Sequence, residues 1–211
     1  MEEQEFKLEV TDPGRFDEIA AAPEIVGAAR GPERRLEMTA DYIDTEDLRL
    51  LHAGYAYRVR YEGDHWVATV KADLPGGGED GLHRHREWEA KVASPVPDLS
   101  VFADPDLKAE LHRLQGDRSL TTLFRVDMER RIRQLELAQG CQAEWAADRG
   151  RILAGGKAEE VREVELELKA GPLEPVARLA EVLKAHYPLR PDSRTKFARG
   201  LKLAGLTPER G

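Results

Sequence analysis

The chain contains 211 residues, and its 32 Lys and Arg against 40 Asp and Glu give a formal net charge of −8. This acidic balance argues against nucleic acid as a partner, because the overall field repels phosphate backbones. No run of 18 apolar residues occurs, which excludes a membrane-spanning helix. The single cysteine, Cys141, can form neither an internal disulfide nor a cysteine metal site. We therefore expect a soluble, cytoplasmic protein with neither nucleic acid nor a membrane as a partner.

The N-terminal segment 3–10 alternates polar and apolar residues and predicts a strand with one polar and one apolar face. Thr11-Asp12-Pro13 predicts the start of a helix that runs to about Ala22 and is ended by Pro23. Apolar spacing and turn residues predict further helices over 46–53, 105–115, 173–186 and 193–203.

The residue pattern of most of the remaining chain predicts strands, over 34–44, 55–62, 65–73, 83–92, 121–137, 141–151 and 161–169. Short turns join most of these runs, so an antiparallel sheet of about eight strands is expected. The glycine-rich segment 75–81 predicts a loop. Segment 150–157 is similar to a phosphate-binding loop, but its Lys is one place late and no Ser or Thr follows, so it predicts a turn.

The polar faces of several strands carry blocks of one charge sign, namely Glu3 with Glu5, Arg58 with Arg60, and Glu163 with Glu165 and Glu167. A solvated sheet face, the plain alternative, gains nothing from such segregation. A site for a metal-bound polyphosphate needs both signs around one concavity, because Mg²⁺ or Mn²⁺ prefers carboxylates and phosphate prefers Arg and Lys. A closed antiparallel barrel with its polar faces inward supplies that concavity.

Glu3-x-Glu5-x-Lys7 resembles the ExExK signature of the CYTH superfamily, the triphosphate tunnel metalloenzymes. Other segments resemble this family in the same order, namely Tyr42-Ile43-Asp44-Thr45, Arg58-Val59-Arg60, Lys71, Glu87, Arg130, Asp148, Glu163-Val164-Glu165-Leu166-Glu167, and Lys196 with Arg199. The resemblance covers about residues 1–205 and is strongest to the branch of bacterial inorganic triphosphatases. We expect the chain to lack the helical CHAD domain that follows the tunnel in long members of that branch.

The resemblance implies an α+β fold, in which an eight-stranded antiparallel β-barrel has a polar charged lumen and helices packed outside. It implies one domain over 1–205 and a C-terminal tail over 206–211. The substrate-binding residues that it implies are Lys7, Arg58, Arg60, Lys71, Arg130, Lys196 and Arg199. The implied ligands of Mg²⁺ or Mn²⁺ are Glu3, Glu5, Asp148, Glu163, Glu165 and Glu167, and Glu87 would line the tunnel. The implied catalytic residues are Glu3, Glu5, Lys7 and Glu165.

The placement of two adjacent arginines stays open at this point. Arg130 and Arg131 are adjacent and point to opposite faces of a strand; the polar residues that continue the parity of Arg130 favour Arg130, but a β-bulge would reverse the choice. His83 and His85 have the two-residue spacing of metal ligands on a strand. No third ligand signature accompanies them, so we expect solvated or rim histidines.

The resemblance implies a metal-dependent hydrolase that converts inorganic tripolyphosphate to phosphate and pyrophosphate. A class IV adenylyl cyclase and a thiamine triphosphatase of the same superfamily are the alternatives, as is a non-catalytic module that binds polyphosphate or a nucleotide. The expected partner is a small triphosphate, and the protein is expected to be a monomer or a homodimer.

Overall fold

The computed structural model describes residues 2–73 and 79–206. Residues 75–78 of the predicted loop and residues 207–211 of the expected tail lie outside this part. The strands within it are β1 (Glu2–Val10), β2 (Ala29–Thr45), β3 (Tyr55–Glu62), β4 (Trp66–Asp73), β5 (Leu82–Val92), β6 (Leu120–Glu136), β7 (Gln142–Ala154), β8 (Lys157–Ala170) and β9 (Leu189–Pro191). The helices are α1 (Phe16–Ala20), α2 (Pro23–Ala28), α3 (Arg49–His52), α4 (Pro105–Gln115), α5 (Glu174–His186) and α6 (Lys196–Ala204). Short 3₁₀ helices cover Pro13–Arg15, Glu79–Gly81, Leu99–Val101 and Ala138–Gly140.

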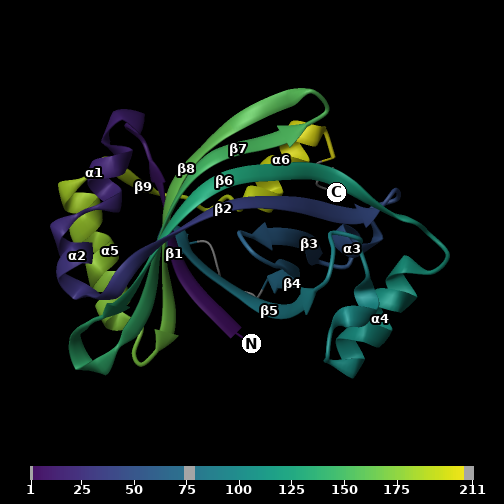
Figure 1. The fold of residues 1–211 in the computed structure, drawn as a ribbon, viewed down its shortest axis with the longest axis horizontal. Helices are drawn as coiled ribbons and strands as arrows, with labels where there is room; N and C mark the ends of the chain where they lie inside the picture. Colours follow the sequence, from purple (N-terminus) through teal and green to yellow (C-terminus); the bar gives the residue numbers. More distant parts are fainter. Residues whose placement is uncertain (1, 74–78, 207–211) are drawn as a thin grey trace.

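The first strand closes the sheet into a barrel. Neighbouring strands follow the order β5-β4-β3-β2-β6-β7-β8-β1. On one edge β1 pairs antiparallel with β8, with Lys7 opposite Glu165, and on its other edge it pairs with β5, with Glu3 opposite His85. Figure 1 shows the long strands β2, β6, β7 and β8 forming one curved wall that faces β3, β4 and β5. The structure confirms the predicted eight-stranded antiparallel barrel; the short β9 extends the β5 side of β1 beyond Leu8.

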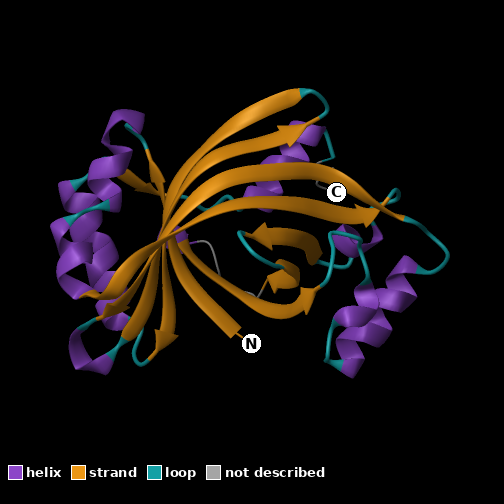
Figure 2. Cartoon of the chain, in the orientation of Figure 1, coloured by secondary structure: helices purple, strands orange, loops and turns teal. Residues whose placement is uncertain are grey.

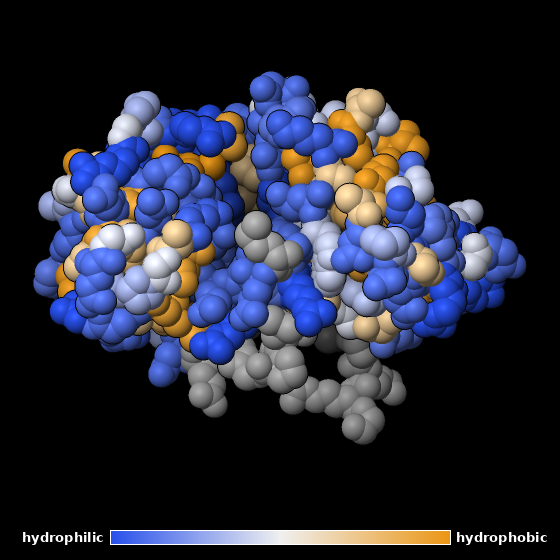
Figure 3. All heavy atoms as spheres, turned by 90° about the horizontal axis from the view of Figure 1, so that it is seen from below, coloured by the Kyte–Doolittle hydropathy of each residue, from blue (hydrophilic) through white to orange (hydrophobic). Residues whose placement is uncertain are grey.

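Helices cover the outside of the barrel at two places (Figures 1 and 2). At one end α1, α2 and α5 pack over an apolar layer that includes the fully buried Trp145. Toward the other end α3 and α4 cover a second layer, in which Leu50 and Leu111 are fully buried. Burial of these apolar side chains stabilises the fold by roughly 1.5–3 kcal/mol for each large residue. No helix in the described residues is long and apolar enough to cross a membrane. The face in Figure 3 is mostly hydrophilic, with hydrophobic residues in separate small areas.

Helix α6 has a different position, because it packs against side chains that share the inner face of the barrel. Its residues Phe197 and Leu201 join an apolar cluster with Phe124 and Val126 of β6. Gly200 permits this close approach: a Cβ atom there would lie 2.1 Å from the Phe124 ring. The helix begins at Thr195, whose side chain accepts a hydrogen bond from the backbone N–H of Ala198, 3.0 Å away. This packing fixes the N-terminal end of α6 over the lumen.

Three local predictions need correction. The predicted helix over 11–22 is a 3₁₀ turn followed by the short α1, and Pro23 begins α2 rather than ending a helix. Proline is favoured at a first helical position because its missing N–H would have no helical partner there. Strand β2 starts at Ala29, five residues earlier than the predicted 34, and β9 was not predicted.

The motif Tyr42-Ile43-Asp44-Thr45 has a structural role at the end of β2. The carboxylate of Asp44 accepts hydrogen bonds from the backbone N–H groups of Thr45 (2.7 Å), Leu50 (3.0 Å) and Leu51 (2.8 Å). A buried carboxylate that collects three backbone donors holds the turn and α3 against the strand. The Asp of this motif therefore shapes the barrel rim.

Candidate active site in the barrel

The barrel encloses a cavity of about 510 Å³. The inner faces of the strands supply its walls, and the N-terminal end of α6 covers one side. The predicted site residues that line it are Glu3, Glu5, Lys7, Arg58, Arg60, Lys71, Glu87, Arg130, Glu165, Glu167 and Lys196. Asp148 and Glu163 are both 0 % exposed and lie in the wall beside Glu165. The alternation of side chains along each strand thus brings charged residues from distant segments to one space.

Asp148, Glu163 and Glu165 form the carboxylate cluster. Asp148 of β7 lies directly opposite Glu163 of β8 in the sheet, and Glu165 follows on the same face of β8. One carboxylate oxygen from each residue lies within 4.8 Å of the other two. All three side chains are buried, which concentrates negative charge at a place where water screens it poorly.

Three cationic side chains neutralise this cluster. Lys196 Nζ lies 2.7 Å from Asp148 Oδ2 and 3.0 Å from Glu165 Oε1, and it also pairs with Glu163. Arg130 donates through Nε to Asp148 Oδ1 at 2.7 Å and through Nη2 to Glu165 Oε2 at 2.6 Å. Lys7 Nζ lies 3.7 Å from Glu163 and 3.6 Å from Glu165. The ammonium group of Lys196 therefore occupies the centre of the three carboxylates.

These charges decide the ionisation of the cluster. Burial alone would raise the pKa of Glu165, but Lys196, Arg130 and Lys7 outweigh it and hold that pKa well below its usual range. The pKa of Asp148 is lowered in the same way, since Arg130 and Lys196 outweigh its burial. The pKa of Glu163 is raised, because burial and the neighbouring carboxylates outweigh its cations. The pKa of Lys196 lies well above its usual range, since the three carboxylates outweigh its burial.

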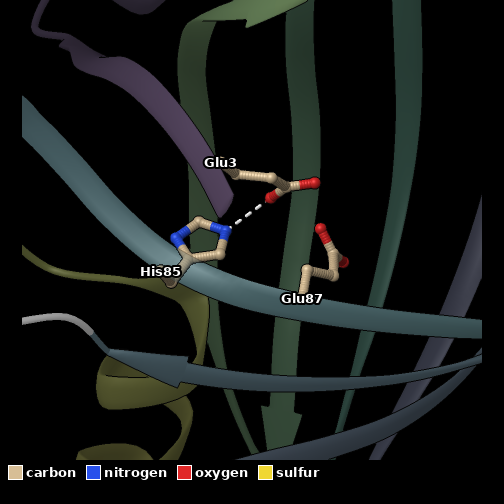
Figure 4. A group of neighbouring side chains, drawn as sticks. All are labelled: Glu3, His85 and Glu87. Carbon is tan, nitrogen blue, oxygen red and sulfur yellow. Dashed lines mark hydrogen bonds and ion pairs between the residues drawn. The ribbon is translucent and has the colours of Figure 1, made fainter. Parts of the chain in front are cut away.

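Glu3, His85 and Glu87 form a second group, the mixed cluster, where β1 meets β5 (Figure 4). His85 Nε2 lies 2.5 Å from Glu3 Oε2, and Glu87 points toward the same place. Lys71 of β4 reaches this cluster, with its Nζ 3.0 Å from Glu3 Oε2, 2.6 Å from His85 Nε2 and 3.3 Å from Glu87 Oε2. Burial, followed by the Glu3 carboxylate, raises the pKa of Glu87 to about 8. The pKa of Glu3 is lowered, since hydrogen bonds from His85 and Glu87 and the charge of Lys71 outweigh its burial.

A pair of arginines on β3 also lines the cavity, and one of them, Arg58, contacts the mixed cluster. Arg58 Nη2 lies 3.5 Å from Glu87, and Arg60 pairs with Glu62 and lies 3.6 Å from Glu89. The Nε atoms of Arg58 and Arg60 are buried and have no hydrogen-bond partner among the described residues. Burial and the adjacent Arg58 lower the pKa of Arg60. Unused guanidinium donors at a cavity wall are the feature that a multiply charged oxyanion would satisfy.

Of the remaining predicted site residues, two line the cavity and one lies outside its lining. Glu5 and Glu167 line the cavity, and Glu167 pairs with Lys169 at 2.6 Å. Arg199 lies outside the cavity lining: its Nε is 2.7 Å from Glu159 and its Nη2 donates to the backbone carbonyl of Glu160. It reaches the carboxylate cluster only through Nη1, 3.7 Å from Glu163.

Arg130 and Arg131 separate as their parity predicts. Arg130 reaches the carboxylate cluster, whereas Arg131 points to the opposite face and pairs with Glu33 at 3.0 Å and Asp17 at 3.3 Å. No register shift interrupts the β6–β7 pairing at this position, where Arg130 lies opposite Asp148. A bulge therefore does not change the side to which either arginine points.

Of the two alternatives expected for His83 and His85, solvated or rim histidines, the solvated one is wrong, because both side chains are buried. They share the inner face of β5 with Glu87, and β1 covers them when it closes the barrel. His83 Nε2 contacts the backbone carbonyl of Asp192 at 2.8 Å, whereas His85 points into the cavity. The period of two from Glu87 back to His85 was the signal in the sequence, but the pairing of β1 with β5 was not visible there.

The carboxylate cluster has a donor set that fits a hard divalent cation. It supplies only oxygen ligands, which suit Mg²⁺ or Mn²⁺. Glu163 Oε2 is buried without a hydrogen-bond partner among the described residues. Carboxylate oxygens of Asp148, Glu163 and Glu165 would hold such an ion at the cluster.

Comparisons with known proteins agree with this architecture. The family model described as the CYTH domain matches residues 1–201. A curated relative, the inorganic triphosphatase of Haemophilus influenzae, is 26% identical over 167 residues, which cover 77% of this chain and 44% of the relative. The chain thus spans less than half the length of that protein.

Among solved structures, a putative adenylyl cyclase from Hippeastrum, described as having a dominant triphosphatase activity, matches with a TM-score of 0.63 and 18% identity over 95% of both chains. A putative adenylate cyclase from Bacillus halodurans matches with a TM-score of 0.57 and 15% identity over 94% of this chain and 97% of its own. At these identities the likeness shows the shared fold.

Proposed function

The chain belongs to the CYTH domain family, and we propose that it is a metal-dependent hydrolase of triphosphates that converts inorganic tripolyphosphate to phosphate and pyrophosphate. The observation that carries this proposal is one cavity with a carboxylate cluster on one wall and, on another, two arginines whose buried Nε donors are unused. A metal-bound polyanion matches both walls. The Haemophilus influenzae relative and the Hippeastrum structure, each described with triphosphatase activity, support the same class of reaction.

The basic side chains of the cavity bind the substrate in this proposal. Arg58, Arg60 and Arg130 have the planar donors that bridge phosphate oxygens, and Lys7, Lys71 and Lys196 add point charges. Together they neutralise the triphosphate and hold it extended along the lumen. Positioning of this kind supplies a large part of the rate enhancement in phosphoryl transfer.

The acidic side chains provide the metal site and orient water. Asp148, Glu163 and Glu165 would hold Mg²⁺ or Mn²⁺, and the bound ion would supply charge stabilisation for the phosphate oxygens and lower the pKa of bound water. Glu3 and Glu5, near the start of β1, line the same cavity. In this proposal their carboxylates accept hydrogen bonds from a water placed in line with the terminal phosphorus. The water oxygen bonds to that phosphorus as one of its protons passes to a carboxylate of this pair, the bridging P–O bond breaks, and pyrophosphate leaves with the bridging oxygen.

One observation favours a second candidate within the family. The cavity also has an apolar wall, to which Leu36, Met38, Met128 and Ile132 contribute. Inorganic tripolyphosphate has no apolar part, whereas the base of ATP or the rings of thiamine triphosphate would contact such a wall. A class IV adenylyl cyclase or a thiamine triphosphatase is therefore the alternative, and a binding module without turnover is the remaining one.

The test is a parallel assay of tripolyphosphate, ATP and thiamine triphosphate, each with Mg²⁺, Mn²⁺ or a chelator, in which phosphate, pyrophosphate and cyclic AMP are followed. Metal-dependent cleavage that is fastest for tripolyphosphate is the expected result. Cyclic AMP from ATP, or preference for thiamine triphosphate, would overturn the substrate and select the corresponding alternative. Tight tripolyphosphate binding without turnover under any metal would make the protein a binding module.

A further inference from the structure

The mixed cluster of Glu3, His85 and Glu87 contains an imidazole, which the carboxylate cluster lacks. We propose that this mixed cluster is a second divalent-metal site, selective for a transition metal ion that accepts imidazole, such as Zn²⁺. The site extends the proposed function, because an ion there shares the cavity with the triphosphate; its existence does not require hydrolysis.

The contacts around His85 Nε2 show a conflict that a metal ion would remove. This one ring nitrogen lies 2.5 Å from Glu3 Oε2 and 2.6 Å from Lys71 Nζ. If Nε2 carries a proton it donates to Glu3, but it then faces a second donor, the ammonium of Lys71. If Nε2 is unprotonated it accepts from Lys71, but its lone pair then faces the Glu3 carboxylate. Either protonation state satisfies one neighbour and opposes the other.

A divalent ion in place of the Lys71 ammonium satisfies all three side chains at once. The ligand atoms of Glu3, His85 and Glu87 lie within 4.8 Å of one another, so small side-chain rotations let one ion bind them at ordinary ligand distances of about 2.0–2.2 Å. Glu3 and Glu87 come from β1 and β5, which are hydrogen-bonded neighbours, and Figure 4 shows their carboxylates directed toward each other. Lys71, whose side chain is 27% exposed, has room to turn toward the substrate.

The donor set determines which ion is bound. Imidazole is a good ligand for Zn²⁺ and related transition ions, whereas Mg²⁺ prefers oxygen and keeps several waters. The two clusters therefore bind different metal ions. The all-oxygen carboxylate cluster binds Mg²⁺, and the mixed cluster binds Zn²⁺ even when Mg²⁺ is in excess.

The experiment is a Zn²⁺ titration of the full chain without substrate and in excess Mg²⁺, followed by imidazole ¹⁵N resonances of labelled histidine and by calorimetry. The imidazole resonance that is present in the wild type and missing in His85→Gln belongs to His85. We expect Zn²⁺ to shift this resonance in the wild type. His85→Gln is expected to weaken Zn²⁺ binding by about tenfold or more. His83→Gln is the matched control, since His83 is also buried on β5 but contacts a backbone carbonyl. We expect this variant to keep the wild-type affinity for Zn²⁺.

A second variant changes the affinity in the opposite direction. Lys71→Met removes the competing ammonium and is expected to tighten Zn²⁺ binding severalfold, a gain that misfolding cannot produce. An unshifted His85 resonance at saturating Zn²⁺, or equal affinities for wild type and His85→Gln, would overturn the proposal. Tripolyphosphate hydrolysis with Mg²⁺ alone is measured separately, so a failure of this metal site and a failure of the proposed function give different results.

Discussion

The carboxylate cluster and the mixed cluster lie in one cavity, and each holds a lysine ammonium among its acidic groups, but their surroundings differ. Lys196 is buried, and Arg130 and Lys7 assist it in neutralising Asp148, Glu163 and Glu165. Lys71 is partly exposed, and Arg58 assists it only from 3.5 Å, at Glu87. The carboxylate cluster therefore has more buried cations for each carboxylate than the mixed cluster has.

This difference has a consequence for protonation. Three cations hold the pKa of Glu165 well below its usual range although burial alone would raise it. In the mixed cluster burial dominates at Glu87, whose pKa rises to about 8, so near neutral pH the cluster carries a proton on Glu87 and a charge on Glu3. The comparison teaches that burial alone does not set the charge of a lumen carboxylate. Glu163 keeps a raised pKa although Lys196 and Lys7 face it, so the balance between nearby cations and neighbouring carboxylates decides the charge.

The largest expected effect comes from removing the central cation of the carboxylate cluster. Lys196→Met leaves buried carboxylates without their nearest partner and should lower the free energy of unfolding by about 3–5 kcal/mol in a chelator. Millimolar Mg²⁺ should restore much of this loss, because the ion replaces the missing charge and binds only the folded chain. Chemical denaturation with and without Mg²⁺ measures both values.

Lys71→Met is the matched variant for this prediction. The mixed cluster is more exposed, and a proton on Glu87 already reduces its charge, so the loss should be clearly smaller than for Lys196→Met. Equal losses for the two variants, or a loss at Lys196 that Mg²⁺ leaves unchanged, would contradict the difference between the clusters.

The next effect concerns the reaction. Glu165→Gln removes one metal ligand and should lower Mg²⁺-dependent tripolyphosphate hydrolysis by roughly 100- to 1000-fold, while the fold is kept. Glu159→Gln on the same strand is the control, because Glu159 contacts Arg199 outside the cavity lining. Steady-state phosphate release compares them, and full activity of Glu165→Gln would remove this carboxylate from the metal site.

A smaller effect is a pH dependence of stability at the mixed cluster. The pKa of Glu87 rises from its ordinary 4.5 to about 8, so in that window the folded chain keeps a proton that the unfolded chain has released. The stability of the wild type therefore falls as pH rises through this window. Gln cannot ionise, so the free energy of unfolding of Glu87→Gln should gain roughly 1–3 kcal/mol over that of the wild type between pH 4.5 and 8.

Urea unfolding in a chelator, at several pH values across the window, measures this difference. Glu89→Gln controls for the loss of a carboxylate from the same face of β5. A difference between Glu87→Gln and the wild type that stays constant with pH would contradict the raised pKa.

The sequence predicted the barrel because its strands have a strict period of two and its charges are grouped by strand face. Glu163 and Glu165 could be placed on one face with Arg58 and Arg60 on another before any strand pairing was known. The need for both charge signs around one concavity indicated a closed sheet, and the family resemblance implied the same closure. The short β9 was beyond prediction, because three residues that end in a proline have no readable period.

The parts of the site that the sequence missed depend on contacts between distant segments. His85 becomes a cavity residue only because β1 pairs with β5, a closure that is not encoded in the residues around His85. Arg199 was grouped with Lys196 by helical spacing, but the carboxylate of Glu159 and the carbonyl of Glu160 hold its guanidinium elsewhere. The alternation of residues along a strand predicts the face on which a side chain lies. The contacts that the side chain makes with distant segments determine its role on that face.

The smallest expected effect tests that distinction on two adjacent residues. Arg131→Gln should leave hydrolysis unchanged and cost about 1 kcal/mol of stability, since Glu33 keeps its pairs with Arg133 and Arg35. Arg130→Gln should raise the KM for tripolyphosphate by about tenfold, because a bidentate arginine is lost from the cavity. Steady-state kinetics and thermal unfolding of both variants give the comparison. A raised KM in Arg131→Gln, with Arg130→Gln unaffected, would show that the functional arginine is the one on the outer face of β6.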